Sequence, residues 1–203
     1  MKNTLRYNPP KNWYIKKGYN AQWFGLTYAC HWICEYFGLI KNVDGELNIK
    51  DNNGLSLLEI GSYKGESTSI FASSGLFKDI YCMEPFEGNE IALDELNDTW
   101  DQVKKEFFTN TRHWDNINLI QDFSFNQVDN FPDLFFDVIY IDASHTYEDI
   151  KEDIKMYLPK CKYIIGGHDY GDQYPGVKKA VDEIFESPDL LLCDGSWFKV
   201  VVP

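Results

Sequence analysis

Long apolar runs are absent from this sequence. No stretch approaches the ~18 residues that a transmembrane helix needs. Residues 1–10 contain no apolar segment of the kind that a secretory signal carries. We therefore expect a protein that does not enter a membrane and that works in the cytoplasm.

Paired cysteine motifs are also missing. No CxxC occurs, and the cysteines number five, with a single close pair, Cys30 and Cys34, at helical spacing. This pattern excludes the usual zinc sites and a disulfide framework. We expect buried, free thiols in a reducing compartment.

Basic residues are scarce. The chain has 19 Lys and Arg against 32 Asp and Glu, a net charge of −13. Such a chain repels phosphate backbones, so nucleic acid is not expected as a partner. Residues 1–34 are the exception, with five basic residues and no acid. They predict a solvated arm or, alternatively, an arm that closes over an anionic ligand or packs on an acidic neighbouring subunit of a homo-oligomer.

The 203 residues are 44% hydrophobic and 16% aromatic, enough for the core of one domain with a small appendage. Residues 41–54 are rich in Asn, Asp and Gly and predict a loop or linker. We therefore divide the chain into an N-terminal helical or lid segment, 1–50, and a main domain, 51–203. Residues 22–39 repeat apolar side chains every three or four positions, which predicts a helix. Its aromatic residues favour packing over lining a site.

From residue 55 onward, short apolar segments alternate with helical patterns. Strands are expected at 55–60, 80–83, 117–120, 137–141 and 163–165, helices at 67–73, 91–108, 147–157 and 177–185, and a hairpin at 190–193 and 196–202. This order predicts an α/β, Rossmann-like, doubly wound sheet that is mostly parallel and has helices on both faces. The hairpin adds an antiparallel C-terminal strand. Ligands of such sheets bind at the carboxyl ends of the strands.

The first strand ends in Glu59 and runs into a turn with Gly61 and Gly65. Glycines permit a tight turn and close approach of the backbone to a ligand. The dinucleotide pattern GxGxxG is absent. Glu59 suits a cationic amino-acid group rather than a phosphate. The alternative is an ordinary strand–helix turn.

The next two strand ends also carry acids. Glu84 follows the second strand and is predicted to accept hydrogen bonds from ribose hydroxyls. Asp122 follows the third strand and is predicted to accept from an adenine amino group, with Phe123 beside the ring. A surface glutamate and an aspartate that merely starts a loop are the alternatives.

Asp142 and His145 follow the fourth expected strand, and His168 and Asp169 follow the fifth. If these strands are neighbours, the four residues are expected to meet in one crevice. Carboxylates beside imidazoles can hold a hard divalent ion such as Mg²⁺. The ion would lower the pKa of a substrate hydroxyl and orient it, and a histidine would remove the proton. Histidines that only cap a helix or pack in a loop are the alternative.

Several segments resemble known methyltransferases. The segment EIGSYKGEST, residues 59–68, resembles motif I of class I S-adenosylmethionine (SAM)-dependent methyltransferases, and MEPFEG, residues 83–88, resembles the acidic end of their second strand. IDASHTYE, residues 141–148, and GHDY followed by PGVKKAVD, residues 167–170 and 175–182, resemble a subgroup of small-molecule and macrolide-sugar O-methyltransferases. The resemblance covers roughly residues 55–202.

The resemblance implies SAM as cofactor, bound by residues that include Ser67 and Asp142 besides those named above. It further implies Asp142 as a metal ligand and His145 as the base. Asp169 matches a second metal ligand, while His168 stands where the subgroup has another acid. Metal-assisted catalysis and metal-free use of His145 both stay open. The expected reaction is methyl transfer to a hydroxyl of a sugar or other small molecule. The alternatives are N-methylation and SAM binding without catalysis.

Overall fold

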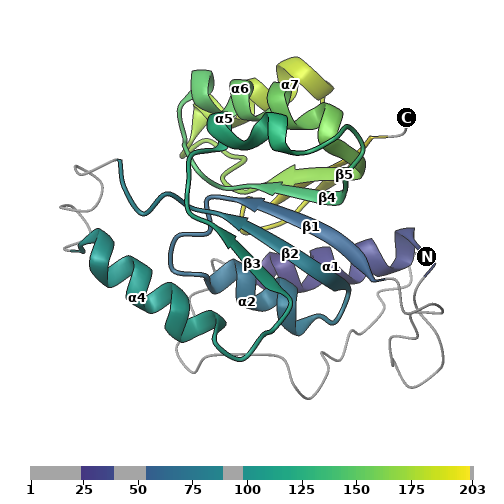
Figure 1. The fold of residues 1–203 in the computed structure, drawn as a ribbon. Helices are drawn as coiled ribbons and strands as arrows, with labels where there is room; N and C mark the ends of the chain where they lie inside the picture. Colours follow the sequence, from purple (N-terminus) through teal and green to yellow (C-terminus); the bar gives the residue numbers. More distant parts are fainter. Residues whose placement is uncertain (1–23, 39–53, 89–97, 202–203) are drawn as a thin grey trace.

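The computed structural model describes residues 24–38, 54–88 and 98–201. Its centre is a seven-stranded sheet in the order β3-β2-β1-β4-β5-β7-β6. Neighbouring strands from β3 to β5 pair in parallel, whereas β7 runs antiparallel to both β5 and β6. The predicted Rossmann-like α/β sheet with an antiparallel C-terminal hairpin is therefore confirmed (Figure 1).

Most predicted elements are found within a few residues of their expected bounds. The strands are β1 (Leu55–Ile60), β2 (Phe77–Met83), β3 (Ile117–Ile120), β4 (Phe136–Ile141), β5 (Cys161–Gly167), β6 (Leu190–Leu191) and β7 (Trp197–Val200). The helices are α1 (Phe24–Tyr36), α2 (Glu66–Ser73), α4 (Trp100–Thr111), α5 (Ser124–Gln127), α6 (Tyr147–Tyr157) and α7 (Pro175–Phe185), with 3₁₀ turns η2 (Val128–Asn130) and η3 (Leu158–Lys160).

The helix expected at 91–108 begins later than predicted. Thr99 has an extended backbone, and its hydroxyl accepts a hydrogen bond from the backbone N–H of Gln102 at 3.2 Å. This side-chain cap satisfies a donor of the first turn, so α4 starts at Trp100. Residues 91–97 lie outside the described residues. The strand expected at 190–193 is also shorter than predicted and ends at Leu191.

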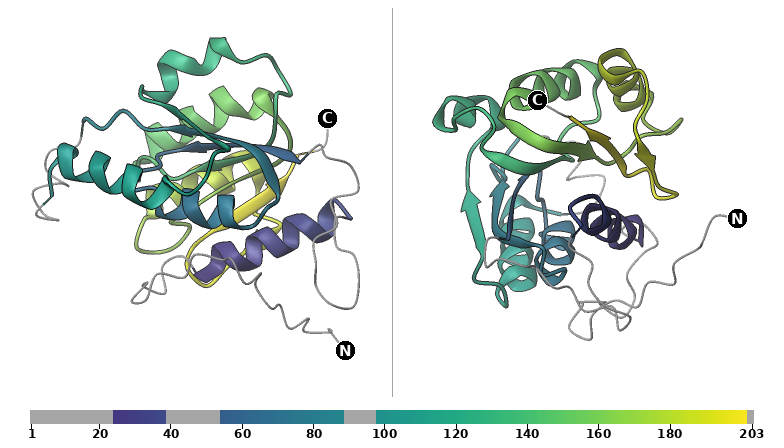
Figure 2. Two further views of the ribbon diagram at one scale, coloured as in Figure 1. Left: turned by 60° about the horizontal axis from the view of Figure 1, so that its bottom comes forward. Right: turned by 90° about the vertical axis from the view of Figure 1, so that its right-hand side faces the viewer.

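Helices cover both faces of the sheet. α1, α2 and α4 lie on one face, and α5, α6 and α7 on the other (Figures 1 and 2). Side chains alternate along each strand, so Leu57 of β1 joins one buried cluster and Leu58 joins the other. The centre of the sheet is thus buried between two apolar layers.

α1 packs into the first of these layers, as its aromatic pattern predicts. Leu26, Ala29 and Ile33 are fully buried there. A residue 169 positions further along the chain holds the N-terminus of α1. The side chain of Asp194 accepts a hydrogen bond from the Gly25 N–H at 2.6 Å. The five basic residues of the predicted arm and the boundary at residues 50 and 51 lie outside the described residues.

The cysteine prediction needs one correction. All five are free and four are buried, but Cys193 is exposed, because it lies in the loop between β6 and β7. Within the described parts of the chain, no helix is long and apolar enough to cross a bilayer.

Candidate functional site

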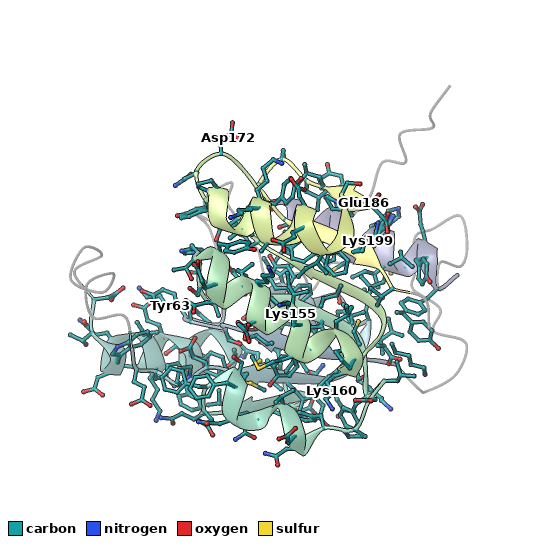
Figure 3. The ribbon with its side chains drawn as sticks, turned by 90° about the horizontal axis from the view of Figure 1, so that it is seen from above. Tyr63, Lys155, Lys160, Asp172, Glu186 and Lys199 are labelled. Atoms are coloured by element: carbon teal, nitrogen blue, oxygen red, sulfur yellow. The ribbon has the colours of Figure 1, made fainter. Side chains whose placement is uncertain are left out.

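The carboxyl ends of the five parallel strands form one edge. Backbone hydrogen bonds of 2.8–3.2 Å join the residues that leave these strands, from Gly61 to Met83, from Asp142 to Ile60, from Glu84 to Ile120 and from His168 to Ile141. Figure 3 shows the same arrangement from above: Tyr63, after β1, and Asp172, after β5, lie towards one side, whereas Lys160, just before β5, lies towards the other. Every site residue predicted from the sequence lies in α2 or in the segments around this edge.

Both glycines of the first turn are required by its geometry. Gly61 has φ 85°, and a Cβ there would lie 2.3 Å from the carbonyl oxygen of Asp142. Gly65 has φ 71°, and a Cβ there would lie 2.8 Å from Thr111. The turn therefore packs directly against the end of β4 and against α4, which only glycine allows.

Glu59 lies beneath this turn and is fully buried. Its carboxylate accepts hydrogen bonds from Ser62 at 2.8 Å, from Ser67 at 2.6 Å and from Thr68. Burial raises its pKa, and these hydroxyls oppose that effect. Glu59 and Ser67 thus bind the turn to the start of α2. Contact of either side chain with a ligand stays a prediction.

Glu84 follows β2 and is 5% exposed. Oε2 accepts the backbone N–H of Tyr63 at 2.8 Å, and Oε1 accepts that of Phe86 at 3.0 Å. Burial raises the pKa of this carboxyl group. A carboxylate has about four acceptor positions, so about two remain after these bonds.

Asp122 follows β3 and is bound by its own turn. It accepts hydrogen bonds from the Phe123 N–H at 2.8 Å and from the side chains of Asn126 at 2.8 Å and Gln127 at 2.6 Å. These bonds lower its pKa, the bond from Asn126 most. The ring of Phe123 stacks on Phe125, with centroids 5.3 Å apart. The predicted adenine contacts of Asp122 and Phe123 stay predictions.

The residues that follow β4 and β5 form one connected cluster. Asp169 binds both histidines, with Oδ2 2.7 Å from Nε2 of His145 and Oδ1 3.0 Å from Nδ1 of His168. Asp142, His168 and Asp169 each offer one ligand atom, and these atoms lie within 4.8 Å of one another. The sequence thus correctly predicts that these four residues meet.

The charges in this cluster are strongly coupled. Burial raises the pKa of Asp142 to about 7, although both histidines act against it. Burial also opposes ionisation of Asp169, but hydrogen bonds from His145 and His168 outweigh it and lower the pKa to about 2. The carboxylates in turn outweigh burial at His168 and raise its pKa to about 9. The hydrogen bond to Asp169 likewise raises the pKa of His145. The shifts thus favour the charged forms of Asp169 and of its two histidine partners, whereas burial favours the neutral form of Asp142.

The donor set of Asp142, His168 and Asp169 fits a divalent cation. It consists of two carboxylates and one imidazole whose ligand atoms lie within 4.8 Å of one another, a spacing that a single ion can bridge. Mg²⁺ prefers oxygen ligands throughout. The two carboxylates also suit Mn²⁺, whereas the imidazole suits Fe²⁺, Ni²⁺ or Zn²⁺ better.

Two neighbours of His145 were not among the residues expected at this site. The ring of Tyr174 stacks on His145, with centroids 4.3 Å apart and planes at 30°. A Cβ on Gly176 would lie 2.7 Å from the backbone carbonyl of His145. Tyr174 directly precedes the segment PGVKKAVD, so that segment is the sequence signal that could have identified it. A cavity of about 230 Å³ adjoins this stack, between residues 169–174 and 193–195.

The comparisons with known proteins agree with this architecture. A family model described as a methyltransferase domain matches residues 58–170. An uncharacterized protein of Acanthamoeba polyphaga mimivirus is 27% identical over 173 residues, which span 79% of this chain and 69% of that protein.

Solved structures share the fold at low identity. The O-methyltransferase NovP aligns with a TM-score of 0.57 and 15% identity over 90% of this chain and 80% of its own. A putative caffeoyl-CoA O-methyltransferase from Staphylococcus aureus aligns with a TM-score of 0.50 and 17% identity over 86% and 91%. Since the family model covers more than half of the sequence, the chain belongs to the methyltransferase domain family, and its fold is that of the class I SAM-dependent methyltransferases.

Proposed function

We propose that this protein transfers a methyl group from SAM to a hydroxyl of a sugar or another small molecule. The observation that carries the proposal is the His145–Asp169 pair, 2.7 Å apart beside Asp142. It lies at the same sheet edge as the glycine turn and Glu84. One edge thus supplies both a cofactor site and a base.

The cofactor half of the site is the turn after β1 with the ends of β2 and β3. The remaining acceptor positions of Glu84 suit the two ribose hydroxyls, and Asp122 with Phe123 suits the adenine. Gly61 and Gly65 let the backbone approach the methionine portion. Bound SAM supplies an electrophilic methyl group on a sulfonium centre.

The acceptor half is the cluster after β4 and β5. His145 is placed to take the proton of the acceptor hydroxyl as the oxygen attacks the methyl carbon and the bond to sulfur breaks. Asp169 and the ring of Tyr174 orient the imidazole. Proximity and orientation supply most of the rate, because the reaction requires little beyond in-line geometry.

Asp142, His168 and Asp169 are the residues that would hold a divalent cation. The family resemblance favours Mg²⁺, and the two carboxylates also suit Mn²⁺. A bound cation would lower the pKa of the acceptor hydroxyl. The acidic chain, with its net charge of −13, favours a small acceptor over nucleic acid.

The experiment is transfer of a labelled methyl group from SAM to a panel of sugars, small alcohols and amines, with and without Mg²⁺ or Mn²⁺. Products are identified by mass spectrometry. His145→Ala is expected to lower turnover by about 10²–10⁴-fold, because it removes the base, and to leave SAM binding intact. His113→Ala is the matched control, since His113 is exposed directly after α4, away from the cluster. Methylation of amines alone, or full activity of His145→Ala, would overturn the proposal.

A further inference from the structure

The two backbone donors that fix Glu84 share an unusual conformation. Tyr63 and Phe86 both have left-handed backbones, with φ 44° and 55°. This region is disfavoured for residues other than glycine, and bulky side chains adopt it only where their surroundings impose it. The bonds to Glu84 therefore depend on whatever holds Tyr63 and Phe86 in place.

Both side chains are anchored to α4 and the residues just before it. The Tyr63 hydroxyl donates to Asp98 at 3.2 Å, and its ring packs edge-on against Trp100 with centroids 6.5 Å apart. The ring of Phe86 packs edge-on against Phe107, with centroids 5.6 Å apart. One helix thus supports both donors of the Glu84 carboxylate.

Further bonds join the turn after β1 to α4 and to the residues just before it. Nζ of Lys64 lies 2.6 Å from Asp98 and 3.5 Å from Glu106. The Asn110 side chain donates to the carbonyl oxygen of Lys64 at 2.9 Å, and Asn110 is 5% exposed. Asp98 is therefore held by a cation as well as by the hydroxyl of Tyr63, and the turn after β1 is bound to α4 along its length.

We propose that Tyr63 is a positioning residue for the ribose of the cofactor. Asp98 and α4 hold its backbone so that its N–H orients Oε2 of Glu84, and the oriented carboxylate then presents its remaining acceptor positions to the ribose hydroxyls. The inference rests on the proposed function, because it assumes that Glu84 binds the ribose of SAM.

The test compares S-adenosylhomocysteine with its 2′-deoxy analogue by calorimetric titration of the full chain. In the unmodified protein, loss of the hydroxyl is expected to weaken binding about tenfold or more, because it removes a hydrogen bond to a charged group. In Tyr63→Phe the same loss is expected to weaken binding only about threefold, because Glu84 is no longer held in the productive orientation. Asp98→Ala, which removes the acceptor of the Tyr63 hydroxyl, is expected to give the same reduction.

Lys160→Met is the matched control. It removes a comparable ion pair, in which Nζ of Lys160 lies 2.8 Å from Asp133 at the opposite edge of the sheet. The ratio of the two dissociation constants, 2′-deoxy analogue to S-adenosylhomocysteine, should therefore stay about tenfold. If Tyr63 had only a structural role, its substitution would weaken the binding of both ligands equally. An unchanged ratio in Tyr63→Phe and Asp98→Ala would therefore overturn the inference. A ratio near one in the unmodified protein would also overturn it. Absence of any S-adenosylhomocysteine binding to the unmodified, folded protein would overturn the proposed function as well.

Discussion

Individual residues at the strand ends are fixed by contacts too close to tolerate small changes. At Gly61 two demands coincide: a positive φ, and a backbone so near β4 that an added Cβ would lie 2.3 Å from the Asp142 carbonyl oxygen. Gly75, after α2, also has a positive φ, 69°, but a Cβ there would meet nothing within 4 Å. A comparison of Gly61 with Gly75 therefore separates the cost of a left-handed backbone from the cost of a steric clash.

Gly61→Ala is therefore expected to lower the free energy of unfolding by about 3 kcal/mol or more, because strain and collision add. Gly75→Ala should lower the free energy of unfolding by about 1–2 kcal/mol, which is the cost of the left-handed backbone alone. Urea denaturation measures both values. Equal losses would show that the close approach to β4 does not constrain the turn.

Elements of this fold are joined by single polar bonds between distant parts of the chain. Asp194, between β6 and β7, accepts the Gly25 N–H at 2.6 Å and the Ser196 N–H at 3.1 Å. It therefore acts as the N-terminal cap of α1. Asp194→Ala is expected to lower the free energy of unfolding by about 1–2 kcal/mol, and Asp194→Asn by less, because the amide oxygen still accepts one bond. Identical losses in thermal unfolding would contradict this role.

A second such bond joins α5 to α6 and should respond to pH. Asp153 is 6% exposed and accepts the Ser124 hydroxyl at 2.6 Å. Burial raises its pKa to about 6, although the bond from Ser124 opposes this. Because the folded pKa is raised, the contribution of Asp153 to stability is complete below its unfolded pKa of about 4 and is lost as the pH rises through about 6.

Asp153→Asn removes this dependence and keeps an acceptor for Ser124. Relative to the unmodified protein, the variant should gain up to about 3 kcal/mol in the free energy of unfolding between about pH 4 and pH 8. Urea denaturation across that range provides the measurement. A difference that stays constant with pH would mean that Asp153 ionises without cost in the folded protein.

Local patterns predict most elements because they follow from chemistry within one segment. β1, β3 and α6 have the bounds that their apolar periodicity predicts. α4 does not, because the Thr99 cap competes with a helical pattern that extends further back. The Asp194–Gly25 bond joins residues 169 positions apart, and no local pattern contains such a contact.

The candidate site follows from the topology of the molecule as a whole. Parallel strands end at one edge, so acids and histidines after successive strands are expected to meet, as Asp142, His145, His168 and Asp169 do. The orientation of each group depends on side chains from elsewhere. The stack of Tyr174 on His145 is of this kind, and the sequence did not predict it. The hydroxyls around Glu59 come from the segment that directly follows it, but their bonds to the carboxylate were not predicted either.

The most direct measurement is calorimetric titration of SAM into the 203-residue chain, with and without a divalent cation and with NAD⁺ as the comparison ligand. We predict micromolar binding of SAM, its loss in Glu84→Ala, and no binding of NAD⁺, because the turn lacks the dinucleotide pattern. A folded protein that binds no SAM under either condition would contradict the methyltransferase function and leave the cluster at β4 and β5 in need of a different explanation.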